Sequence, residues 1–185
     1  MIDAGITAAV AAFAAADGEP VPVSADALAL IDALREAHPQ AAEPDLAAGA
    51  EVALRIIAAL DGHVEGGWSR TSAALVVGSA VAGSRWRKLD SRTAERAIGL
   101  AATQAGGLEE LEAGPLGALQ RAHAVRAGAE AAELAATGVE GHRDALAGRR
   151  GLFALVAPGA DPSAIADGLG DRWLIRPRTS ERTLA

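Results

Sequence analysis

The sequence predicts an all-α fold, a compact multi-helix domain around one buried helix rich in Ala, Gly and Val. Hydrophobic residues make up 50% of the 185 residues, but aromatic residues only 3%. Strands favour aromatic and β-branched side chains, so an Ala-rich composition favours helices. The run Ala73–Gly83 contains no charged residue and is apolar on every face. Such a helix must be covered on all sides by other helices, and a chain of this length can bury a core of that kind.

The N-terminal half of the sequence predicts three helices. The first is expected at Ile2–Ala16, where the uncharged run is shorter than the ~20 residues that span a bilayer. No basic segment precedes this run, so a signal peptide is not indicated. Ser24 can cap a second helix, Ala25–His38. A third is expected over residues 46–60, with Gly62 as its C-terminal cap.

The middle of the sequence predicts three more helices. Thr71 or Ser72 can cap the buried one. The next begins near Ser91 and ends at Gly106–Gly107, and the last runs over 116–138 after a proline. Small residues recur four apart along the buried helix and predict close packing against its neighbours: Ala74, Gly78 and Ala82.

The last part of the sequence carries shorter signals. We expect a single helical turn at Arg143–Leu146 and short helices at Leu152–Val156 and Ser163–Leu169. The apolar triplet Trp173–Ile175 has strand-like character.

Composition limits the possible functions of the chain. No internal repeat or low-complexity linker divides it, so we expect residues 1–177 to form a single domain and the polar tail 178–185 to be disordered. The net charge of −7 argues against a nucleic-acid partner. The absence of Cys excludes disulfides and zinc–thiolate sites. We therefore expect a cytoplasmic protein that uses no cofactor and does not attach to a membrane.

Histidine spacing predicts no metal site, because no two of the four histidines are four residues apart on one helix. Three of them lie at expected helix ends or in turns and are predicted to be on the surface: His38, His63 and His142. His123 lies within a helix, close to Arg121 and on the same face as Arg126. An arginine can clamp a carboxylate with two parallel hydrogen bonds. This group is either a carboxylate site or, in the plainer interpretation, a solvated or dimer-facing polar strip.

An acidic cluster precedes the expected helix at 116–138. It consists of Glu109, Glu110 and Glu112. Paired carboxylates can perform acid–base chemistry, but a solvated loop is the plainer interpretation of such a cluster before a Gly-Pro break.

Several segments, taken in order, resemble one known family. They are residues 67–72 (Gly-Trp-Ser-Arg-Thr-Ser), the small-residue helix 73–83, residues 96–101 with the Gly pair 106–107, residues 126–138, and residues 171–175 (Asp-Arg-Trp-Leu-Ile). Their order and spacing resemble the MmgE/PrpD family, which includes 2-methylcitrate dehydratase, cis-aconitate decarboxylase and iminodisuccinate epimerase. The resemblance covers about residues 44–177, and residues 1–43 are the least similar part.

The resemblance implies a fold and an altered site. In the family an all-α domain carries a smaller α+β lid, the active site lies between them, and a homodimer forms through the helical domain. Family members are longer than this chain, so we expect a truncated form, the helical domain without its lid. Ser69 follows Trp68 where the family enzymes carry an active-site His, and Gly117 or a neighbour stands where they carry a Lys. Serine needs an activating partner to act as a base, and glycine has no group to offer.

Two functions are compatible with these features. The first is a stand-alone MmgE/PrpD-like helical domain without the family's usual catalysis. It would act as a homodimer or in a hetero-complex with a longer family member. The alternative is a lyase, dehydratase or isomerase on a small carboxylate, alone or completed by a second polypeptide. Its reduced site would use Ser69 and His123 as catalytic residues, with Arg121 and Arg126 binding the substrate.

Overall fold

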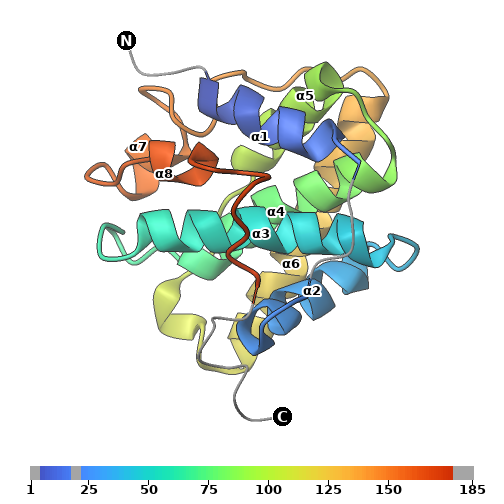
Figure 1. Ribbon diagram of the computed structural model, residues 1–185. Coiled ribbons are helices and arrows are strands. Elements are labelled where there is room, and N and C mark those ends of the chain that lie inside the picture. Colours follow the sequence, from blue (N-terminus) through green and yellow to red (C-terminus); the bar gives the residue numbers. More distant parts are fainter. Residues whose placement is uncertain (1–4, 18–21, 177–185) are drawn as a thin grey trace.

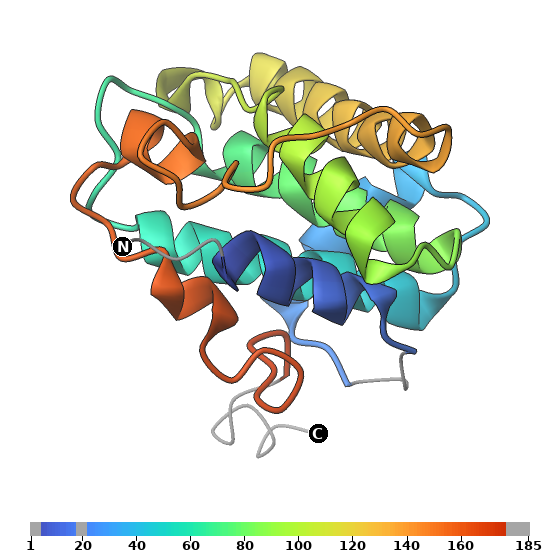
Figure 2. The same ribbon diagram turned by 90° about the horizontal axis from the view of Figure 1, so that it is seen from above.

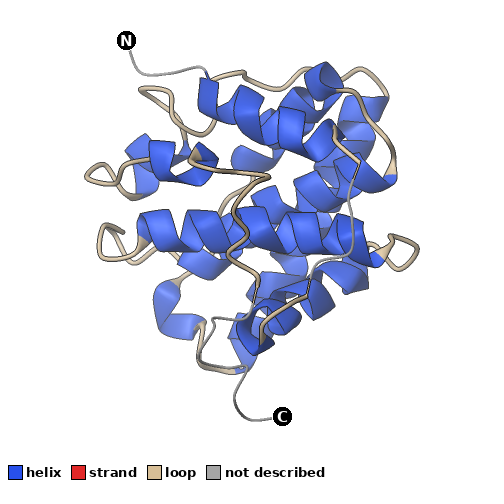
Figure 3. Ribbon diagram, viewed as in Figure 1, coloured by secondary structure: helices blue, strands red, loops and turns tan. Residues whose placement is uncertain are grey.

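The computed structural model describes residues 5–17 and 22–176, and in these ranges the predicted all-α fold is confirmed. Figure 3 shows helices joined by loops, with no strand in the part described. In chain order the elements are α1 (Gly5–Ala15), α2 (Ala25–Ala37), α3 (Glu43–Leu60), α4 (Arg70–Trp86), α5 (Ser91–Ala102), the 3-10 helix η1 (Glu109–Leu111), α6 (Pro115–Ala136), α7 (Leu152–Val156) and α8 (Ser163–Ala166). None of the helices described is both long enough and apolar enough to cross a membrane. The tail 178–185, expected to be disordered, lies outside the described residues.

Helix α4 is the buried helix that the sequence predicts. Every residue from Ser72 to Arg85 is buried. Figures 1 and 2 show α4 between α3 on one side and α6 on the other, and α5 and α1 also pack against it. The prediction that other helices cover this segment on all sides is confirmed.

Small residues allow these helices to meet backbone to backbone. A Cβ atom placed on Gly78 would lie 2.6 Å from the carbonyl oxygen of Gly49 on α3, and one placed on Gly49 would lie 2.6 Å from that of Gly78. On the other side of α4, a Cβ on Gly128 of α6 would collide with the carbonyl oxygen of Val76. The predicted close packing is confirmed, and a side chain at any of these glycines would push the helices apart.

The N-terminal cap of α4 and the C-terminal end of α5 differ from those predicted. Ser69 caps α4, rather than Thr71 or Ser72, because its Oγ accepts the Ser72 N–H at 3.0 Å. Asp90 caps α5 in the same way, through the amide three residues later at 2.8 Å. Helix α5 ends at Ala102, before the predicted glycine pair. Consecutive polar residues can all serve as caps, and only the residue whose backbone is extended does so.

The C-terminal segment after α8 crosses in front of α3 (Figure 1). The strand-like expectation for Trp173–Ile175 is wrong, because no strand in the described part is available to pair with it. Instead the Ile175 N–H donates to Glu51 Oε2 at 3.0 Å, and the Ile175 carbonyl accepts the Ser24 N–H at 2.6 Å. Helix α8 is also shorter than predicted. At the single helical turn expected over 143–146 the structure has a hydrogen-bonded turn, in which the Gly148 N–H donates to the Asp144 carbonyl at 2.9 Å.

A buried ion pair on α3 holds this segment in place. Arg55 Nε donates to Glu51 Oε1 at 2.6 Å, and the two side chains are 2% and 1% exposed. The remaining guanidinium donors bind four backbone carbonyls, one in α8 and three in the segment after it: those of Ile165, Asp167, Gly168 and Arg172. Every charge and donor in the pair is therefore matched, as burial requires.

His38 is the one predicted surface histidine that the structure contradicts. It is only 2% exposed, because the end of α2 packs against α4 and α6. Its Nε2 lies 2.8 Å from Ser79 Oγ, which itself donates to the Val125 carbonyl at 2.6 Å. Burial, and then the nearby positive charge of Arg87, lower the pKa of His38 to about 4. His63 and His142 are exposed, as predicted.

Candidate functional site

The candidate site lies at the N-terminal end of α4, where the loop before η1 pairs with the loop before α4. The Ser69 N–H donates to the Gly107 carbonyl at 3.0 Å, and the Glu109 N–H donates to the Gly67 carbonyl at 2.9 Å. Gly107 has a φ of +100°, and a Cβ there would lie 3.0 Å from Ser72 Oγ, so glycine is required. This pairing places residues 108–112 beside the first turn of α4.

Glu112 connects three side chains at this point. The Ser69 hydroxyl donates to Glu112 Oε1, and the Ser72 hydroxyl lies 3.4 Å from the same oxygen. On the other side, Arg121 Nη1 donates to Glu112 Oε2 at 3.0 Å. The two serines are buried, the Glu112 side chain is 17% exposed and the Arg121 side chain is 35% exposed. We call Ser69, Ser72, Glu112 and Arg121 the Glu112 cluster, and its most accessible group is the guanidinium of Arg121.

The structure brings together two of the four predicted site residues, Ser69 and Arg121, through Glu112. His123 and Arg126 are exposed, and their side chains form no hydrogen bond or ion pair within the part of the chain described. Successive helical residues are rotated by about 100°, so His123 and Arg121 lie on different faces of α6. The predicted arginine–histidine group is thus divided between the Glu112 cluster and an exposed strip.

Gly117 lies one turn before Arg121 on α6 and is buried. A Cβ placed on it would collide with the carbonyl oxygen of Glu112 and lie 2.9 Å from that of Leu111. The two positions at which the family resemblance places a His and a Lys, Ser69 and Gly117, therefore both contact Glu112. A side chain at Gly117 would require the turn at 111–112 to move.

Glu112 is the residue whose role the sequence does not reveal. In the predicted solvated cluster, Glu109 and Glu110 are exposed, but the Glu112 side chain turns inward. Glu112 and Arg121 are nine residues apart across a Gly-Pro break, which is not a spacing that places two side chains on one helix face. Only the turn between η1 and α6 brings them together.

A shallow hollow of about 370 Å³ adjoins the Glu112 cluster, next to Trp68. Arg70 lines it and pairs with Asp61 and, at 3.6 Å, with Glu109. These two carboxylates neutralise the charge of Arg70. Its guanidinium is therefore less available to bind an anion than that of Arg121.

Comparison with known families assigns the chain to one of them. Residues 11–165 match the MmgE/PrpD N-terminal domain. Individual curated proteins gave no match to the chain. The matched range begins upstream of the residues on which the resemblance rested and takes in α2 to α7 completely. The matched range also contains the whole Glu112 cluster. Because the match covers most of the chain, the chain belongs to the MmgE/PrpD family and carries that family's N-terminal domain.

Proposed function

We propose that this chain acts as a non-catalytic helical domain of the MmgE/PrpD type, which works by association with a second copy of itself or with a longer family member. The observation that supports this proposal most strongly is the environment of Ser69, which stands where the family resemblance places an active-site His. Its hydroxyl is buried, accepts the Ser72 N–H and donates to Glu112. The hydroxyl is thus committed to interactions within the protein.

The other groups near Ser69 support this proposal. A general base must have a free lone pair facing the substrate. Glu112 Oε1 faces two serine hydroxyls and Oε2 faces Arg121. Gly117 has no side chain, and backbone carbonyls fill the space that one would need. The internal pairing of Glu112 with Arg121 also leaves the cluster without net charge.

An apolar surface on α6 supports association. Leu116 and Leu119 are 49% and 59% exposed. The Gln120 side chain binds both backbone groups of Leu108, at 2.7 and 3.2 Å, and so holds this third exposed leucine against the same helix. Exposed leucines grouped in this way are typical of protein–protein contact surfaces.

The test is the native mass of the purified chain. We expect light scattering to give about twice 18.6 kDa, or a larger complex that contains a longer family member. A Leu116→Glu/Leu119→Glu variant should be monomeric, whereas the control Leu28→Glu, at a comparably exposed leucine on α2, should keep the wild-type mass. A wild-type chain that stays monomeric and co-purifies with no family member would contradict the proposal.

A second candidate is a lyase or isomerase that acts on a small carboxylate. The observation in its favour is the partly exposed Arg121 guanidinium beside the Ser69–Glu112 contact, since arginine binds carboxylates well. Turnover of 2-methylcitrate or cis-aconitate by the wild-type chain, lost in both Glu112→Gln and Arg121→Gln, would establish this candidate. Absence of turnover by the purified wild-type chain is the result that we expect.

A further inference from the structure

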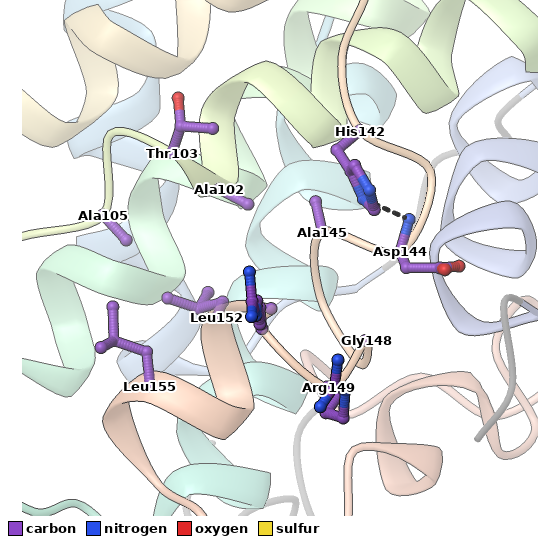
Figure 4. A pocket seen from close by; sticks show the side chains of 12 residues that line it. Ala102, Thr103, Ala105, His142, Asp144, Ala145, Gly148, Arg149, Leu152 and Leu155 are labelled. Carbon is purple, nitrogen blue, oxygen red and sulfur yellow. Dashed lines mark hydrogen bonds between the residues drawn. The ribbon is translucent and has the colours of Figure 1, made fainter. Parts of the chain in front are cut away.

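A cavity of about 550 Å³ lies between the end of α5 and the segment that contains α7. Figure 4 shows Ala102 and Ala105 on one side of it, with Leu152 and Leu155 of α7 and the turn that carries Arg149 around the rest. Its volume is in the range of sites that bind small molecules. It shares no lining residue with the Glu112 cluster.

The wall of this cavity is largely apolar. Alanine side chains from α5, the loop after it and the turn before α7 face the leucines of α7 across the cavity. Leu155 is 64% exposed. Leu152 and Ala145 are already buried. An apolar group bound here would therefore mainly cover the exposed surface of Leu155, which is favourable in proportion to the area covered.

The rim of the cavity carries two arginines without partners. The side chains of Arg149 and Arg150 make no ion pair or hydrogen bond to any residue within 5–17 or 22–176. Other surface arginines, such as Arg87 and Arg96, pair with glutamates at 2.6 and 2.5 Å. Two adjacent guanidinium groups that are unpaired within the described ranges make the rim locally positive, although the chain as a whole has a net charge of −7.

Asp144, the acidic residue in the lining, does not neutralise these arginines. Its carboxylate points away from Arg149 in Figure 4, and its Oδ1 atom is buried with no hydrogen-bond partner in the described part of the chain. Its N–H donates to His142 Nδ1 at 3.1 Å. A neutral His142 therefore carries its proton on Nε2, which adds a donor to the rim.

We propose that this cavity binds a small amphipathic anion, in which a carboxylate or phosphate group ends a short apolar chain. Arg149 and Arg150 hold the anionic group, since guanidinium groups bind carboxylates and phosphates through two parallel hydrogen bonds. The apolar chain lies against Leu152, Leu155 and the alanines. This site does not depend on whether the chain associates with itself.

The test is calorimetric titration of the full chain with octanoate and with octyl phosphate. We expect saturable binding at a single site, at least about tenfold tighter than binding of octan-1-ol. The tighter of the two ligands identifies the anionic group. An Arg149→Gln/Arg150→Gln variant should bind at least about tenfold more weakly, with an unchanged melting temperature in the absence of ligand.

The matched control is Lys88→Gln/Arg92→Gln, which removes the same charge from two exposed cations elsewhere and should bind as the wild type does. Equal loss of binding in both double variants would show general charge attraction and would overturn the proposal. So would the absence of saturable binding at millimolar ligand, or octan-1-ol binding as tightly as the two anions.

Discussion

Two Glu–Arg pairs in this protein have the same chemistry and opposite surroundings. Glu51 and Arg55 on α3 are 1% and 2% exposed, whereas Glu112 and Arg121 are 17% and 35% exposed. The guanidinium of Arg55 is surrounded by one carboxylate and four backbone carbonyls. Among the described residues, that of Arg121 hydrogen-bonds to the side chain and carbonyl of Glu112, and the Arg121 side chain is partly exposed. The first pair anchors the C-terminal segment. The second pair leaves guanidinium donors of Arg121 available to bind a ligand or a partner.

The largest difference between the two pairs should appear when each loses its arginine. We expect Arg55→Leu to lower the free energy of unfolding by about 3–5 kcal/mol, because Glu51 is left as a buried, unpaired charge. Arg121→Leu, the matched change at the exposed pair, should cost about 1 kcal/mol or less. Urea unfolding followed by circular dichroism measures both values. Equal losses would show that burial does not separate the two pairs.

A smaller loss of stability is expected when the pH is lowered, because the buried His38 resists protonation in the folded protein. The pKa of His38 is lowered to about 4 in the folded protein, mainly by burial and then by the charge of Arg87. Between the ordinary histidine pKa near 6.5 and about 4, the unfolded chain takes up a proton that the folded chain does not. Stability is therefore lost as the pH falls through this window, by about 3 kcal/mol in total, and not at higher pH.

The control for this pH effect is His38→Leu, which removes the titrating group and leaves Ser79 bonded to the Val125 carbonyl. Its free energy of unfolding should fall less than that of the wild type between pH 6.5 and 4. Parallel pH profiles for wild type and His38→Leu would show that His38 is not held neutral.

The smallest expected effect is the loss of stability when Ser69 is replaced, because Ser69 both caps α4 and donates to Glu112. Ser69→Ala removes the cap of α4 and the hydroxyl that donates to Glu112, and we expect a loss of about 1 kcal/mol in thermal or urea unfolding. Thr71→Ala tests the cap predicted from the sequence and should change stability by only a few tenths of that amount. A larger loss for Thr71→Ala would contradict the cap that the structure assigns.

Local sequence patterns predicted the parts of this fold that depend on neighbouring residues. The uncharged run Ala73–Gly83 predicted a buried helix, because a helix without a polar face has no side to present to water. Helix α7 has the predicted bounds, and α2 has the predicted Ser24 cap. The cap of α4 was misplaced, since several polar residues stand together before that helix and each could serve.

The candidate site could be predicted only in part, because its members come from distant segments. Ser69 and Arg121 were candidates from the resemblance and from side-chain chemistry, but neither source pointed to the carboxylate that joins them. Glu112 looks the same in the sequence as the exposed Glu109 and Glu110. His38, at a helix end, gave no sign that Ser79 lies 2.8 Å from its ring.

By itself, the sequence determined that this chain folds as helices around an Ala-, Gly- and Val-rich centre, and it indicated the family to which the chain belongs. Helix formation and amphipathicity are decided by residues within a few positions of each other. Only the tertiary structure decided which polar groups are buried with partners, as Arg55 is, and which are exposed without a partner among the described residues, as Arg149 and Arg150 are. Burial and pairing depend on segments more than 100 residues apart, such as α3 and the residues after α8, and no local pattern encodes that contact.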